Sequence, residues 1–133
     1  MSNSSLLRWL PRLWRVCGAL ALATGTIMGA LIAHLPDKDF AHGGREIARV
    51  AMQIQMWHGL ALILLGLMHK SASLLLLIGG CGVLLGILLF CGSVYNTAFT
   101  GQHAILAPVG GSLLILSWFI LALGWAIEKE SKE

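Results

Sequence analysis

Charged residues are scarce in this chain, and acidic ones are missing from the interior of its long apolar stretches. Asp, Glu, Lys and Arg make up only 11% of the 133 residues, and just six of these residues are Asp or Glu. A soluble domain carries about 25% charged residues. The composition therefore excludes an ordinary soluble domain.

The sequence also lacks the usual signatures of catalysis and metal binding. It has no Gly-rich phosphate loop followed by Lys, no nucleophile elbow and no paired carboxylate in an apolar segment. Cys17, Cys81 and Cys91 show no CxxC spacing and fall in apolar stretches, where a small side chain packs well. We therefore expect no enzyme, no cofactor and no metal centre, and we assign the cysteines to packing.

Long apolar runs dominate what is present. The hydrophobic fraction is 57% and the mean hydropathy is +0.82. A helix of about 20 apolar residues crosses a bilayer, and a spanning segment must satisfy its own backbone hydrogen bonds. The sequence predicts an all-α integral membrane four-helix bundle with short connections. Its spans are expected at about residues 13–35, 45–68, 74–98 and 104–127.

The two ends of the chain carry most of the basic residues. Residues 1–12 are expected to form an interfacial segment bent at Pro11, ahead of an uncleaved first helix, and residues 128–133 a charged tail. In this topology Arg8, Arg12, Arg15, Lys70, Lys129 and Lys132 share one side, and Lys38, Arg45 and Arg49 the other. Because positive charge favours the cytoplasm, both termini are predicted to be cytoplasmic. The net charge of +3 therefore reflects membrane orientation and not a nucleic-acid surface.

Small residues recur at helical spacing in three of the spans. Such residues let neighbouring helices approach closely in a membrane. We expect these faces to pack within the bundle, with an oligomer contact as the alternative. The helix-packing set is Ala21, Gly25, Gly29 and Ala33 in the first span, Gly82 and Gly86 in the third, and Gly110, Ser117 and Gly124 in the fourth.

A few polar residues lie where lipid should disfavour them. Gln55 and His58 share a helix face with Ala51, and His34, Ser93, Tyr95 and Asn96 end spans on the outer side. We expect His34, Gln55, Ser93 and Tyr95 to form a hydrogen-bond network that His58 reaches from below. Three interpretations stay open: a structural network, a small-molecule or proton-related site, and haem or metal ligation.

Several motifs occur in an order that resembles a known family. They are Gly29-Ala30 with Ala33-His34, Gln55-Met56-Trp57-His58 with Leu60-Ala61-Leu62, Leu89-Phe90-Cys91-Gly92-Ser93-Val94-Tyr95, and Pro108-Val109-Gly110-Gly111 with Trp118. Together they resemble the YgdD family of small bacterial inner-membrane proteins, or domain of unknown function 423. The resemblance runs from the first predicted helix to the fourth.

The resemblance implies a four-helix membrane protein of a family whose activity is not established. This chain departs from the family pattern at Ile32, where a Gly is usual, at Ile54, where an aromatic is usual, and at Cys91, where Ser is usual. The motif residues coincide with the polar set and add Pro108, Gly110 and Gly111. The candidate polar or ligand site is therefore His34, Gln55, His58, Ser93, Tyr95, Pro108, Gly110 and Gly111.

The function predicted from the sequence is that of a small accessory or structural protein of the bacterial inner membrane. It would act through helix contacts with a membrane complex or with a second copy of itself. Its expected partners are the lipid bilayer and a membrane protein or a second copy, and no nucleic acid is expected to bind. Two alternatives remain: a small oligomeric transporter or channel, and a haem- or quinone-associated redox subunit. Coupled transport generally needs an ionisable residue deep in the membrane, and only His58 meets that condition.

Overall fold

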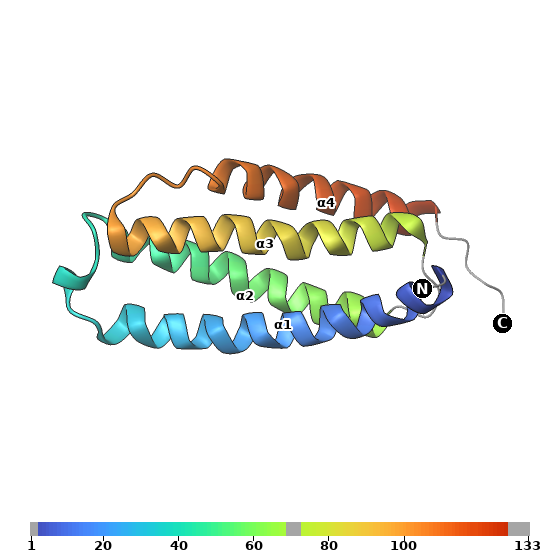
Figure 1. Cartoon of the computed structure of the whole chain (residues 1–133), viewed down its shortest axis with the longest axis horizontal. Helices are drawn as coiled ribbons and strands as arrows, with labels where there is room; N and C mark the ends of the chain where they lie inside the picture. Colours follow the sequence, from blue (N-terminus) through green and yellow to red (C-terminus); the bar gives the residue numbers. More distant parts are fainter. Residues whose placement is uncertain (1–2, 69–72, 128–133) are drawn as a thin grey trace.

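A computed structural model describes residues 3–68 and 73–127, with the side chains of residues 3–8 outside this description. The described chain is an all-α bundle with short loops, as predicted (Figure 1). Successive helices run antiparallel, so the start of α1 and the end of α4 lie at the same end of the bundle. The elements are α1 (Asn3–His34), the short 3-10 helix η1 (Asp37–Asp39), α2 (Gly44–Met68), α3 (Leu74–Thr100) and α4 (Ala107–Ile127).

Within the described residues, four helices are long and apolar enough to cross a membrane. Large apolar side chains cover their outer surfaces. Leu88 on α3 is 63% exposed and Phe119 on α4 is 70% exposed. A soluble protein rarely leaves apolar patches of this extent open to water. The exposed belt is instead the surface that a bilayer covers.

Helix boundaries differ from the prediction at two places. Helix α1 begins at Asn3 and continues through Pro11, so it starts ahead of the span predicted from residue 13, and the interfacial location of residues 1–12 stays a prediction. Gly101 ends α3 in the left-handed region at φ 73°, and helix α4 starts at Ala107 and not at residue 104, since Pro108 has no N–H for the interior of a longer helix. Pro108 then occupies the first turn of α4, where its missing N–H costs no hydrogen bond. The predicted turn at residues 69–72 and the tail at 128–133 lie outside the described residues.

The bundle consists of two tight helix pairs, α1 with α2 and α3 with α4, joined mainly through α2 and α3. Glycine permits the close approach within each pair. A Cβ built on Gly18 would lie 2.5 Å from the carbonyl oxygen of Gly59, and one on Gly110 would collide with the backbone nitrogen of Phe90. Backbones therefore touch at these crossings, as small residues allow in membranes.

Most of the predicted packing residues lie at these crossings. Gly25 and Gly29 face Met56 and Met52 of α2, and Ala21 contacts the position of Gly59. On the other pair, Gly82 faces Ser117, Gly86 faces Leu114, and Gly124 faces Leu75 and Leu76. Ala33 differs, because it is exposed.

Each end of the bundle is held by a large side chain. At the end that carries the termini, Trp14 is fully buried and packs against Gly80, where any Cβ would collide with its ring. At the opposite end, Arg45 donates to the carbonyls of Ile32 and Leu35 and pairs with Asp37 at 2.9 Å. These carbonyls end α1 without helical partners, so Arg45 caps the helix.

Candidate functional site

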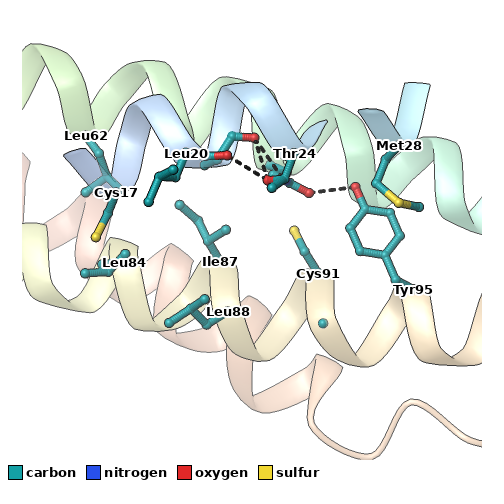
Figure 2. A pocket seen from close by; sticks show the side chains of 13 residues that line it. Cys17, Leu20, Thr24, Met28, Leu62, Leu84, Ile87, Leu88, Cys91 and Tyr95 are labelled. Carbon is teal, nitrogen blue, oxygen red and sulfur yellow. Dashed lines mark hydrogen bonds between the residues drawn. The ribbon is translucent and has the colours of Figure 1, made fainter. Parts of the chain in front are cut away.

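Gln55 lies at the centre of a hydrogen-bond network that joins three helices. From α2 its Nε2 donates to the carbonyl of Ala21 at 2.8 Å and to Thr24 Oγ1 at 2.7 Å, both on α1. Tyr95 of α3 donates from its hydroxyl to Gln55 Oε1 at 2.7 Å. Thr24 donates in turn to the carbonyl of Leu20 at 2.8 Å. Figure 2 shows Thr24 and Tyr95 converging from opposite walls of a cavity.

The direction of these bonds is fixed by chemistry. A peptide carbonyl can only accept, so the Gln55 atom facing Ala21 must be the amide nitrogen. The other amide atom, the oxygen, then faces Tyr95, whose hydroxyl must donate. Gln55 is only 6% exposed, and a buried amide without partners is costly. The network therefore satisfies this amide while linking α1, α2 and α3.

Beside the network a cavity of about 500 Å³ runs between α1 and α3, with α2 behind it (Figure 2). None of its lining residues carries a charge. The α1 wall extends from Cys17 to Met28 and the α3 wall from Leu84 to Tyr95. At about 1.5 Å per helical residue, each wall is about 16 Å long. The cavity is therefore elongated along the helices and opens at the bundle surface.

His58 points away from this cavity toward α4. Its Nδ1 lies 2.7 Å from the carbonyl of Ile54, and its Nε2 accepts a hydrogen bond from Trp118 Nε1 at 3.0 Å. Because the carbonyl can only accept, Nδ1 carries the ring proton and Nε2 does not. Both nitrogens of the neutral ring are therefore occupied, and the pair links α2 to α4.

The other predicted site residues lie apart from the Gln55 network. His34 is exposed at the last residue of α1, and Ser93 contributes only its backbone carbonyl, which accepts from Thr97 Oγ1 at 3.1 Å. Pro108 is exposed, while Gly110 and Gly111 pack on Phe90. Of the predicted site residues, the structure thus brings together only Gln55 and Tyr95, and the others lie outside the Gln55 network.

Two participants went unrecognised as site residues from the sequence. Thr24 joins the Gln55 network, and Trp118 binds His58. A lone threonine in an apolar helix usually bonds to its own backbone, so its type gives no signal. Trp118 lies in one of the family motifs, and an indole N–H needs a hydrogen-bond partner when it leaves water. This requirement could have identified Trp118 as a site residue from the sequence.

Metal ligation has no obvious place in the part of the chain described. Residues 3–68 and 73–127 contain no group of three His, Cys, Asp or Glu side chains close enough to hold an ion. Cys91, beside the network, directs its thiol to the carbonyl of Ala51 at 3.4 Å. The interior of the bundle around Gln55 is therefore uncharged and hydrogen-bonded.

Four apolar helices with short loops and an uncharged interior define the chain as a bacterial multi-pass membrane protein. The family model "Protein of unknown function (DUF423)" matches residues 28–111, which covers more than half of the chain. The chain belongs to this family, also called UPF0382.

Relatives occur in distant bacteria. A UPF0382 membrane protein of Staphylococcus haemolyticus is 30% identical over 114 residues, covering 84% of this chain and 93% of the relative. Another, from Haemophilus influenzae, is 33% identical over 99 residues, covering 73% of this chain and 80% of the relative. No solved structure matches the chain. The first of these relatives thus extends the family match from residues 28–111 to 84% of the chain, and the activity of the family is unknown.

Proposed function

We propose that this chain is a non-enzymatic accessory protein of the bacterial inner membrane. It works through contacts between its helices and those of a larger membrane complex or of a second copy. The proposal rests on an exposed face of α1 that is built like a helix interface and packs on nothing within the bundle.

That face is a stripe of small residues, which we call the α1 stripe. Its members recur at alternating steps of four and three residues, the spacing of a helix–helix seam. At about 100° per residue they cover one side of α1, turned away from both α2 and the cavity. All are exposed. The stripe consists of Ala19, Ala23, Thr26, Ala30 and Ala33.

The low burial of α1 supports the same assignment. Only 17% of the α1 span is buried inside the bundle, against 44% of the α3 span. Lipid-facing helices commonly carry large apolar residues, whereas helix contacts in membranes favour Gly, Ala, Ser and Thr. A stripe of Ala and Thr on the least covered helix therefore suits a partner helix better than lipid.

The polar interior supports a non-enzymatic role. The Gln55 side chain donates two hydrogen bonds and accepts one. Both ring nitrogens of His58 also have hydrogen-bond partners. A proton carrier or a metal ligand needs a nitrogen that is free to exchange its partner. These residues serve better as ties between helices.

We also assign the end with the two termini to the cytoplasm. Arg12 and Arg15 lie at that end of α1, and the positive-inside rule favours them there. The α1 stripe would then run through the bilayer with Ala19 nearer the cytoplasm and Ala33 nearer the outside.

Photocrosslinking in intact membranes tests the accessory role. A benzoylphenylalanine at Thr26, on the α1 stripe, is expected to give a discrete crosslinked product of fixed mass whose second component mass spectrometry identifies. The matched control is the same group at Ala122, exposed on α4. Absence of any product at Thr26, or equal products at both positions, would contradict the proposal.

A further inference from the structure

The cavity between α1 and α3 is separate from the α1 stripe on which the proposed function rests. We propose that it binds one long hydrocarbon chain of a neutral lipid whose polar end carries a hydroxyl group. Three features identify this ligand: the shape of the cavity, its lack of charge, and the direction of the hydrogen bonds at its wall.

The shape of the cavity fits an extended chain. Its walls run about 16 Å along the helices at about 1.5 Å per residue, parallel to the lipid chains around the protein. A volume of about 500 Å³ lies in the range of ordinary ligand pockets. A transmembrane helix is about 10 Å across with its side chains, and it would need far more room. A single flexible chain fits the space.

An unoccupied position lies in the α3 wall. A Cβ built on Gly92 meets no atom within 4 Å, although Gly92 borders the cavity. Most glycines of the helix crossings have a neighbour within 3.4 Å of that position. Gly92 thus keeps the groove open where every larger residue would narrow it.

The wall chemistry selects a neutral ligand. Asp, Glu, Lys, Arg and His are all absent from the lining. A charged group at this depth would lack a counter-ion, and burying an unpaired charge is costly. A phosphate or carboxylate headgroup is therefore excluded from the cavity.

The network selects a hydrogen-bond donor. Both N–H groups of Gln55 are used, the Tyr95 hydroxyl donates to Gln55, and the Thr24 hydroxyl donates to Leu20. What remains are lone pairs on the oxygens of Tyr95, Thr24 and Gln55, which can only accept. All three residues border the cavity. A ligand hydroxyl can use them, whereas an ether, ester or ketone oxygen cannot.

A matched pair of ligands tests this selection. Native mass spectrometry of the purified full-length chain would count adducts with oleyl alcohol and with methyl oleyl ether, which differ in the hydroxyl proton. Because one net hydrogen bond is worth about 1 kcal/mol, the alcohol should bind about fivefold more tightly. Equal binding of the two, or no adduct with either, would overturn the proposal.

Two variants separate the groove from the network. Gly92→Phe fills the groove and should abolish the alcohol adduct, while Leu85→Phe adds the same ring on an exposed part of α3 outside the cavity and should not. The combined variant Thr24→Val, Gln55→Met and Tyr95→Phe replaces the three side-chain members of the network by apolar groups, which costs little when shapes match. It should bind alcohol and ether equally. An alcohol preference that survives this change would contradict the assigned acceptors.

Natural sources of the hydroxyl are distinguished by two further ligands. Monoolein presents a glycerol hydroxyl, and an isoprenoid quinol presents a ring hydroxyl. The oxidised form of the quinol, a quinone, has a carbonyl at this position and no proton to donate. Binding of either hydroxyl ligand in competition with oleyl alcohol supports the site and assigns its source. Equal competition by the quinone would count against donor selection. The α1 stripe plays no part here, so failure of this test leaves the crosslinking result at Thr26 unaffected.

Discussion

At the scale of single residues, Gln55 joins three helices through one side chain. We predict that Gln55→Leu lowers the free energy of unfolding by about 1–3 kcal/mol, because it removes three hydrogen bonds and leaves the Tyr95 hydroxyl unpaired. Denaturation by sodium dodecyl sulfate in mixed micelles, followed by circular dichroism, measures this. Gln53→Leu, at an exposed position of α2, is the matched control and should change little.

A double-mutant cycle isolates the Gln55–Tyr95 bond. Tyr95→Phe should cost less in the Gln55→Leu background than in the wild type, with a coupling of about 0.6 kcal/mol, the average for hydrogen bonds between membrane helices, and at most about 1.7 kcal/mol. Strict additivity of the two substitutions would show that this bond contributes nothing to stability.

The tautomer of His58 is a second prediction at this scale. With Nδ1 donating to Ile54 and Nε2 accepting from Trp118, nitrogen-15 spectra should show the proton on Nδ1. Trp118→Phe keeps a ring but removes the donor, so it should move the Nε2 resonance far more than the Nδ1 resonance. A protonated Nε2 in the neutral wild-type ring would contradict the contact with Trp118.

The sequence placed Gln55 and Tyr95 in one network but did not predict Thr24 or Trp118 as partners. Gln55 and His58 share the helix face expected from their spacing, yet a step of three residues separates them by about 60° around the helix. That angle suffices to send Gln55 to α1 and α3 and His58 to α4. Residue type and depth are visible in a sequence, whereas the neighbour that fills the facing space is set by packing.

At the scale of helices, the glycines differ in what surrounds them. We predict that Gly18→Leu lowers the free energy of unfolding by at least about 2 kcal/mol, because its Cβ would meet the carbonyl of Gly59 and Ile63. Gly92→Leu should stay within about 0.5 kcal/mol of the wild type, since nothing lies near its Cβ. Gly29→Leu should fall between them, because only the flexible Met52 side chain must move.

The same denaturation assay compares these three variants. A large loss for Gly92→Leu would show that the groove is filled by protein, and a tolerated Gly18→Leu would show that α1 and α2 do not touch at this crossing. Cys81→Ala, at an exposed position on α3, serves as the neutral reference.

Arg45 organises the junction of α1, α2 and the loop that connects them. Arg45→Met removes the donors to Ile32 and Leu35 and the pair with Asp37, so the loop should open more easily. We expect the Ala41 amide, which donates to Ala98, to exchange with solvent about tenfold faster, equivalent to about 1.4 kcal/mol. Lys38→Met, at an exposed position of η1, is the control. Unchanged exchange in Arg45→Met would remove the capping role.

Element boundaries show what hydropathy can and cannot predict. The span predicted at 45–68 matches α2, because its polar flanks are abrupt. Helix α4 starts later than expected, since residues 104–106 are apolar enough to extend the pattern although Gly101 has already turned the chain. Pro11 lies inside α1, and its carbonyl packs close to Gly66.

At the scale of the whole molecule, the fold class followed from the sequence, but the open groove did not. Four apolar spans require a helical bundle. Which helices pair closely depends on matching glycines such as Gly18 with Gly59, and these faces only become apparent together in three dimensions. Once α1 packs on α2 and α4 on α3, a cavity remains between α1 and α3, and the α1 stripe remains uncovered.

The most direct test of the accessory role is the native mass of the gently solubilised protein, with identification of every protein that accompanies it. We predict a stable assembly larger than one chain, either with a membrane partner in fixed ratio or with a second copy. The variant Ala23→Leu with Ala30→Leu should reduce it to a single chain, while Ala122→Leu should not. A wild-type protein that runs as one chain without any other protein would contradict the account.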